Sequence, residues 1–334
     1  MTFVQNKKNG KPDNLEIQWR VGEYNRLSKE DGDKPESDSI QNQHSINQKH
    51  IQYLRDQGEH IMPSINDAVR RMAAAQGWAW ERMVGAGVGV PGPVLSDGFV
   101  ERCVDLHWFR FNPQKELSAL LGIPVTAGND ANMAAMGEYW QGSGKNFRSL
   151  LFITLGTGVG SGIILDGGRM LYGAKGLAGE IGHTVVCPDE PLQCTCGHYG
   201  CLDQMTSATG IVRNAHRCLA RSEEASVLRG KPDFTCQDVF DAAKAGDGIA
   251  VEAVTYCLTF LGKALAYASY IVDPEVFILG GGVSRAGEYM LRIVEKVYHE
   301  NAQMSDSFAQ VRLAALGNDA GIIGCAGAAI LADK

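Results

Sequence analysis

The stretch Ser149–Gly173, SLLFITLGTGVGSGIILDGGRMLYG, decides the fold. Two apolar, β-branched segments flank the glycine turn Gly156–Gly160, and Asp166-Gly167-Gly168 is typical of a second, hairpin turn. A glycine turn that follows a buried strand lets backbone N–H groups and a hydroxyl approach a phosphate closely. This pattern alone is weak evidence, because glycine turns between strands are common.

Strands and helices alternate on both sides of this hairpin, which predicts an α/β protein with ligands at the carboxyl ends of its strands. A second buried strand is followed by Gly280-Gly281-Gly282. Two glycine-rich loops, each after a buried strand, favour a nucleotide ligand. The other strands are expected at 83–90, 99–104, 123–126 and 311–315. The helices are expected at 61–76, from 113, at 131–140, 208–220, 237–245 and 249–272, after the second glycine loop, and from 319.

Composition excludes several classes of protein. The chain has 334 residues, of which 45% are hydrophobic and 40 are glycine, so a globular protein of two domains is expected. A net charge of -7 argues against a general nucleic-acid-binding surface. The polar start predicts no signal peptide, and Glu252 and Lys263 within Ile249–Val272 favour a buried helix over a membrane span. Nine cysteines without a secretory signal indicate a reducing cytoplasm.

Residues 1–57 differ in composition from the rest of the chain. They are rich in Asn, Gln, Lys, Asp and Ser and show almost no apolar periodicity. Such a segment buries too little apolar surface to order itself, so we expect residues 1–57 to be poorly ordered and to form a region of their own.

A cluster of metal-binding residues follows the hairpin: His183, Cys194, Cys196 and Cys201. One imidazole and three thiolates form the ligand set of a closed, structural zinc site, which leaves no position for a reactive water. The alternative is that they are ordinary buried thiols and a core histidine. Three of the nine cysteines fall within eight residues among Gly, Thr and Gln, which favours the metal. His198 and Cys187 are competing ligands of lower rank.

Two further groups of polar residues are candidates for chemistry. Asn129-Asp130 lie between a short strand and a helix, where Asp130 either accepts a proton from a substrate hydroxyl or caps the helix, and position alone does not separate the two. Glu180, His183 and Asp203 flank the metal loop and suit hydrogen bonding to a polyol; the alternative is a set of solvated loop charges.

From about residue 58 to the end, the chain resembles the sugar kinases of the ROK family, especially the bacterial glucokinases. The resemblance rests on GVGVPGPV, AGNDANMAA, LFITLGTGVGSGII, GAKGLAGEIGHTVV, CTCGHYGCLDQMTSATGI and VFILGGGVS, in the family's order. It implies an actin-like ATPase (ribonuclease H-like) fold of two lobes, residues 58–127 with 318–334 and residues 128–317. It also implies ATP-dependent phosphorylation of a hexose, with glucose as the leading substrate and fructose or N-acetylmannosamine as alternatives.

The resemblance also assigns roles to residues. It implies Asp130 as the base on the sugar 6-hydroxyl, with Asn129, Glu180, His183 and Asp203 as sugar ligands. It implies structural Zn²⁺ on His183, Cys194, Cys196 and Cys201. It implies nucleotide contacts from the two glycine loops, with Mg²⁺ neutralising the phosphates of ATP, in a cytoplasmic homodimer or homotetramer. The nucleotide-binding residues are then Gly156, Thr157, Gly158, Gly280, Gly281 and Gly282.

The chain departs from the family pattern twice. Asp203 stands where the pattern CxCGxxGCLE has Glu, so its carboxylate is one methylene shorter. The phosphate-binding DxGGT loop does not occur in residues 1–57, where residues 20–45 instead resemble the start of a large serine recombinase, with Ser28 matching its nucleophile beside Arg26. We therefore expect an incomplete N-terminal lobe that retains sugar recognition while phosphoryl transfer is severely weakened.

Two other functions compete with the kinase. The first is a non-catalytic, sugar-binding or regulatory protein, because the family includes repressors, although residues 1–57 lack paired apolar helices of a helix-turn-helix. The second is a DNA recombinase, which the missing remainder of that catalytic domain opposes.

Overall fold

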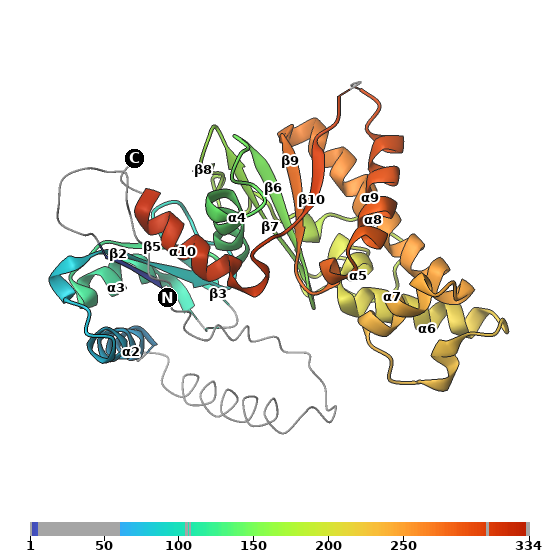
Figure 1. The fold of residues 1–334 in the computed structure, drawn as a ribbon, viewed down its shortest axis with the longest axis horizontal. Coiled ribbons are helices and arrows are strands. Elements are labelled where there is room, and N and C mark those ends of the chain that lie inside the picture. Colours follow the sequence, from blue (N-terminus) through green and yellow to red (C-terminus); the bar gives the residue numbers. More distant parts are fainter. Residues whose placement is uncertain (1, 6–60, 104–105, 107, 305–306, 332–334) are drawn as a thin grey trace. The chain divides into compact units, whose positions relative to one another are not determined.

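The computed structural model describes residues 2–5, 61–103, 106, 108–304 and 307–331 (Figure 1). The chain divides into two compact units. Unit 1 comprises Met1–Gly137, Tyr172–Ala178 and Asn318–Lys334, and unit 2 comprises Glu138–Leu171 and Gly179–Gly317. The first division lies ten residues beyond the expected position at 127/128. The sequence shows no loop or change of composition at this boundary, because helix α4 (Asp130–Gln141) continues across it.

Unit 2 is built on a five-stranded sheet with the order β10-β9-β6-β7-β8. Strands β6 and β7 pair antiparallel, as do β7 and β8, while β6 pairs parallel with β9 and β9 parallel with β10. Every residue of β9 is buried, as expected for a central strand of a parallel sheet. The five strands are β6 (Leu150–Leu155), β7 (Val159–Leu165), β8 (Arg169–Met170), β9 (Val276–Gly280) and β10 (Gln310–Leu313).

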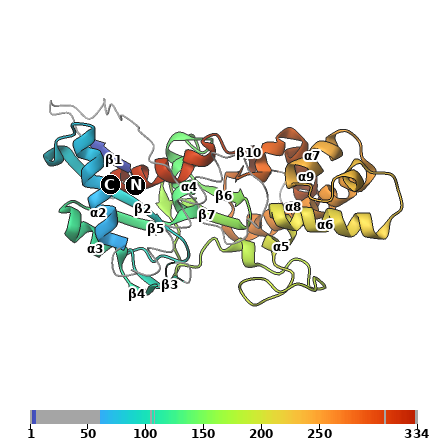
Figure 2. The same ribbon diagram turned by 90° about the horizontal axis from the view of Figure 1, so that it is seen from below.

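The core of unit 2 forms around helix α8 (Gly248–Val272), which begins at the Asp247 cap and ends at Asp273 in the left-handed conformation. Figure 2 shows α6 (Ala208–Arg221), α7 (Cys236–Lys244) and α9 (Glu288–Asn301) gathered beside it, and all three pack against it. Among the described residues, α8 is the one helix long and apolar enough to cross a membrane, but 61% of that apolar window is buried inside the protein. The prediction of a buried helix here is confirmed.

Unit 1 contains a smaller sheet with the order β1-β2-β5. Strand β1 runs antiparallel to β2, and β2 runs parallel to β5. Helix α10 packs on all three strands, α3 packs on β5 and on α2, and β3 and β4 form a separate antiparallel pair. The elements are β1 (Thr2–Gln5), α2 (Ile61–Ala75), β2 (Met83–Val90), β3 (Val100–Cys103), β4 (Trp108–Phe111), α3 (Pro113–Leu121), β5 (Val125–Asn129) and α10 (Ala320–Leu331).

Two strands of unit 1 were not expected. The sequence analysis placed no strand in residues 1–57, and Thr2–Gln5 is one, because pairing with β2 extends a segment too short to show periodicity by itself. The remaining residues up to 60 lie outside the described residues. Strand β4 was also missed, because its four residues Trp-Phe-Arg-Phe do not alternate and are stabilised by their partner β3.

The two sheets share a parallel core but differ in size. The parallel pair β2–β5 of unit 1 corresponds to β9–β10 of unit 2. In unit 2 the next position holds β6, which runs parallel to β9 and leads into β7 and β8. In the described part of unit 1 that position holds β1, which runs antiparallel, and no strand follows it. The expectation of an incomplete N-terminal lobe concerns residues 6–60, which lie outside the described residues, and it stays a prediction.

We expect Gly324→Ala to destabilise unit 1 by about 3 kcal/mol or more, because a Cβ at this position of α10 would lie 1.5 Å from the Met133 carbonyl oxygen on α4. Gly321→Ala on the same helix is the matched control, since no atom lies within 4 Å of its Cβ position. Helix propensity alone would make that control neutral or up to about 1 kcal/mol stabilising. Urea denaturation of both variants measures the difference, and equal midpoints would contradict the close packing of the two helices.

Candidate active site

Two glycine loops of unit 2 leave the same edge of the sheet. They follow the carboxyl ends of the parallel strands β6 and β9, where Thr154 pairs with Gly280. Gly281 has a φ of 83°, and a Cβ there would lie 2.4 Å from the carbonyl oxygen of Leu155. Only glycine therefore lets the second loop approach the end of β6 so closely, and the two loops predicted to bind nucleotide begin at the same edge of the sheet.

Hydrogen bonds to its carbonyl groups hold the first loop in place. The carbonyl oxygen of Gly156 accepts a hydrogen bond from the Ala208 N–H (2.8 Å), and that of Thr157 accepts one from the Thr209 hydroxyl (3.2 Å). Within the described parts of the chain, the N–H groups of Thr157 and Gly158 have no hydrogen-bond acceptor. The turn therefore offers two adjacent amide donors and the Thr157 hydroxyl to an anion.

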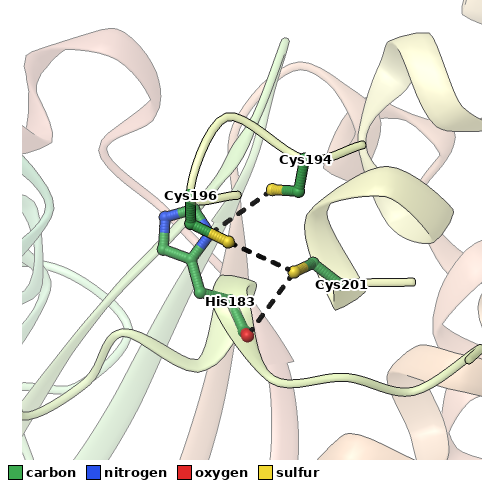
Figure 3. Close-up of side chains that lie close together, drawn as sticks. All are labelled: His183, Cys194, Cys196 and Cys201. Carbon is green, nitrogen blue, oxygen red and sulfur yellow. Dashed lines mark hydrogen bonds between the residues drawn. The ribbon is translucent and has the colours of Figure 1, made fainter. Parts of the chain in front are cut away.

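The four predicted metal ligands converge in unit 2 (Figure 3). Their donor atoms all lie within 4.8 Å of one another. The Cys194 Sγ lies 3.7 Å from the His183 Nδ1, and the Cys196 Sγ lies 3.5 Å from the Cys201 Sγ. In a tetrahedral site with Zn–S bonds of about 2.3 Å, neighbouring sulfur ligands lie about 3.8 Å apart, so the donor set and its spacing fit zinc. The lower-ranked ligands Cys187 and His198 are not part of this group.

The loop that carries the cysteines is organised by Gln204, which sequence reasoning missed. Its Oε1 accepts hydrogen bonds from the N–H groups of Gly200 (2.8 Å) and Cys201 (3.2 Å), and its Nε2 donates to the Leu192 carbonyl (2.7 Å). The side chain is buried, so these bonds fix both ends of the cysteine loop before any metal binds. Gln204 lies three residues after Cys201, in the first turn of helix α5 (Leu202–Thr206). This spacing is typical of a capping box and could have identified the residue from the sequence.

A buried ion pair ties the same loop to helix α6. Both carboxylate oxygens of Glu190 accept hydrogen bonds from the Arg217 guanidinium, at 2.6 and 2.8 Å. The Glu190 side chain is 1% exposed and that of Arg217 is 35% exposed. The hydrogen bonds from Arg217 are the main cause that holds the pKa of Glu190 below its usual value.

We expect Glu190→Gln to destabilise unit 2 by about 2–3 kcal/mol at pH 7, because it leaves the guanidinium without its anionic partner. Because the folded-state pKa is lowered, this stabilisation is present above the unfolded pKa and is lost as the pH falls through the folded one. Urea denaturation at pH 7 and at acidic pH measures both effects. Glu252→Gln, which breaks the exposed pair Arg221–Glu252, is the matched control and should cost less than about 0.5 kcal/mol. Equal losses in the two variants would contradict the assignment.

The predicted sugar-binding residues of unit 2 gather at the start of β7. Asp203 Oδ1 accepts a hydrogen bond of 2.6 Å from the Val159 N–H. Glu180 is half-buried and precedes the short 3-10 helix Ile181–His183. A Cβ on Gly182, in the middle of that helix, would lie 2.2 Å from the Val159 carbonyl oxygen. Glycine thus brings the loop that bears Glu180 and His183 against the first residue of β7, where the phosphate turn (Gly156–Val159) ends.

In unit 1, Asn129 and Asp130 lie where β5 ends and α4 begins. The Asn129 Oδ1 accepts hydrogen bonds from the N–H groups of Ala131 (2.9 Å) and Asn132 (3.1 Å), and its Nδ2 donates to the Gly92 carbonyl (3.1 Å). Helix capping is therefore provided by Asn129. The Asp130 Oδ1 accepts from the N–H of Ala131 (2.8 Å) and from the Asn129 Nδ2 (3.2 Å), and its Oδ2 has no partner among the described residues.

The sheet order of unit 2, with glycine loops at the carboxyl ends of β6 and β9, defines an actin-like ATPase fold, as the sequence analysis expected. The ROK family model matches residues 40–334, and the chain belongs to the ROK family. The match begins inside residues 20–45, the segment that was compared with recombinases, all of which lies outside the described residues.

Relatives and solved structures agree with this family. A glucokinase from Halalkalibacterium halodurans is 38% identical over 81% of this chain and 83% of its own length. A ROK family glucokinase from Streptomyces griseus, solved in complex with glucose and AMPPNP, is 33% identical and superposes with a TM-score of 0.64 over 79% of this chain and 86% of its own. An N-acetylmannosamine kinase from Citrobacter koseri (34% identical; 63% and 66% covered) and a xylose repressor from Caldicellulosiruptor bescii (27%; 73% and 61%) also match.

Proposed function

We propose that this protein is an ATP-dependent hexose kinase that phosphorylates the 6-hydroxyl of glucose. The observation that carries the proposal is the phosphate turn, which offers two unpaired N–H groups. The second glycine loop approaches the chain just before this turn, at Leu155, and the loop that bears Glu180 and His183 approaches its end, at Val159. The glucokinase relatives and the complex of one of them with glucose and an ATP analogue support glucose as the substrate and ATP as the phosphate donor.

In this proposal each residue has one task. Asp130 accepts the proton of the sugar 6-hydroxyl through Oδ2 as that oxygen attacks the γ-phosphorus. The side chains of Asn129, Glu180, His183 and Asp203 orient the sugar hydroxyls, and the N–H groups of Thr157 and Gly158 hold the phosphates. Gly280, Gly281 and Gly282 leave room for the nucleotide beside Gly156. Bound Mg²⁺ would neutralise the phosphate charge, while alignment by the protein lowers the remaining barrier.

We also propose that His183, Cys194, Cys196 and Cys201 bind a structural Zn²⁺. All four tetrahedral positions are then taken by protein ligands, so the metal supplies rigidity and no reactive water. With Nδ1 of His183 facing Cys194, the opposite ring nitrogen, Nε2, remains for a sugar hydroxyl, and the metal fixes the orientation of the ring.

A coupled assay of ADP release with glucose, fructose and N-acetylmannosamine tests the reaction and its substrate. We expect glucose to be the best substrate, with turnover well below the ~1–100 s⁻¹ usual for kinases, because the DxGGT loop is missing. Turnover at a normal rate would refute the expected impairment, and preference for another hexose would refute glucose.

A non-catalytic sugar-binding protein is the second candidate. The xylose repressor among the relatives favours it. Calorimetric binding of glucose without any phosphorylation would establish this function instead. We also propose that the protein is cytoplasmic and forms a homodimer or homotetramer. Light scattering of the purified chain tests the oligomeric state.

A further inference from the structure

Asp203 makes a contact that a sugar ligand does not need. Its Oδ1 accepts the Val159 N–H at 2.6 Å, within the range of strong, charge-assisted hydrogen bonds. The same oxygen lies 2.8 Å from the position that a Cβ on Gly158 would occupy. The carboxylate is therefore in direct contact with the last two residues of the phosphate turn, and a side chain at Gly158 would displace it.

The segment from Asp203 to Thr209 holds the phosphate turn at three points. Asp203 binds the N–H of Val159, the Ala208 N–H binds the carbonyl of Gly156, and the Thr209 hydroxyl binds the carbonyl of Thr157. Of these three bonds, the one from Asp203 is the shortest and the only one that involves a charged group.

The same segment begins at the metal cluster. Cys201 lies two residues before Asp203, and the Leu202 N–H between them donates to the Thr184 carbonyl at 2.9 Å. Rigidity imposed at the cysteines is thereby carried to the Asp203 carboxylate through one short, hydrogen-bonded stretch of backbone.

We propose that Asp203 is a positioning residue for the nucleotide, whose carboxylate holds the Thr157–Val159 turn in the conformation that receives phosphate. This role rests on the proposed function and extends it, because the family pattern has Glu here and the resemblance implied only sugar binding. The side chain of Asp203 is one methylene shorter than that of Glu, and its carboxylate lies against the turn backbone. The residue thus links the metal-bound loop to the nucleotide.

The test is calorimetric titration of the full-length, metal-loaded chain with a non-hydrolysable ATP analogue and, separately, with glucose. We expect Asp203→Ala to weaken binding of the ATP analogue at least about tenfold, because a charge-assisted bond to the turn is lost. Asp203→Asn keeps an oxygen that accepts the Val159 N–H and should retain nucleotide affinity to within about threefold. Thr209→Val should weaken binding of the analogue by a smaller factor, because it removes one neutral bond from the same turn.

Asp247→Ala is the matched control, since this aspartate also accepts two backbone N–H groups in unit 2, from Val227 (2.8 Å) and Ala250 (3.1 Å). It should lower stability and leave the affinity for the ATP analogue unchanged. The positioning role is overturned if Asp203→Ala binds the analogue as the wild type does, or if Asp203→Asn loses as much affinity as Asp203→Ala. Should Asp203→Ala fail to retain metal, the comparison of Asp203→Asn and Thr209→Val with the wild type decides. A wild-type chain that binds no nucleotide refutes the kinase proposal instead.

Discussion

Asp130→Asn is expected to lower the rate of glucose phosphorylation about 10³-fold while glucose and nucleotide still bind. The substitution keeps the size of the side chain and the Oδ1 acceptor for the Ala131 N–H, so helix α4 should begin as before. It removes the basic Oδ2, the oxygen without a partner in the described structure, and a general base of this kind contributes about 10²–10⁴ to the rate. Transfer of labelled phosphate from ATP to glucose measures the loss, and it remains sensitive when the wild type is slow.

Two measurements separate a chemical role for Asp130 from a structural one. Calorimetric titration with glucose should give the same affinity for Asp130→Asn and the wild type to within a few-fold, and the urea midpoints should agree. Asp67→Asn, on the exposed face of α2 in the same unit, controls for loss of charge and should phosphorylate glucose as the wild type does. Undiminished phosphorylation by Asp130→Asn would remove this residue from the mechanism.

The parts of the site that lie close in sequence could be predicted, because local spacing determines them. The three cysteines and His183 lie within 19 consecutive residues, and the structure brings their donor atoms within 4.8 Å of one another. The two glycine loops were likewise recognisable, since each follows a continuous apolar strand and parallel pairing brings their ends to one edge.

The contacts that the sequence did not reveal join residues far apart in the chain. The bond from Val159 to Asp203 spans 44 residues, and that from Arg217 to Glu190 spans 27. Neither pair has a periodicity or a motif that links its members, because the fold of the sheet and of α5 and α6 creates the proximity. For the same reason Asp203 was interpreted only as a sugar ligand.

Short elements were missed for a related reason. Strands β1 and β4 have four residues each, too few for an alternating pattern, and each is stabilised by its partner strand. At Asn129-Asp130 the sequence offered two equal interpretations. In the structure the Asn129 amide oxygen accepts the N–H groups of Ala131 and Asn132, and the Asp130 Oδ1 also accepts that of Ala131. The role of Asp130 as a base therefore stays a prediction.

Cys196→Ser is expected to abolish stoichiometric zinc binding and to lower the melting temperature of unit 2. The Cys196 side chain is exposed, so the substitution removes a thiolate without opening a cavity in the core. Loss of a protein ligand should weaken zinc affinity at least about a hundredfold, the upper end of what outer-shell changes cause. Elemental analysis of the purified chain gives the zinc content, and thermal denaturation with and without a chelator gives its contribution to stability.

The cysteine loop itself supplies the control for the metal prediction. Cys187 lies on the same loop but outside the cluster, with its Sγ 3.8 Å from the Tyr256 hydroxyl, so Cys187→Ser should retain one zinc per chain and the sensitivity to chelator. In Cys196→Ser the chelator should no longer change the melting temperature, because the site that it empties is already lost. If the wild type contains no zinc, or if Cys187→Ser and Cys196→Ser lose it equally, the four-residue site is wrong. In that case no metal would make the backbone before Asp203 rigid, and the proposed effect of the metal on the phosphate turn would be refuted.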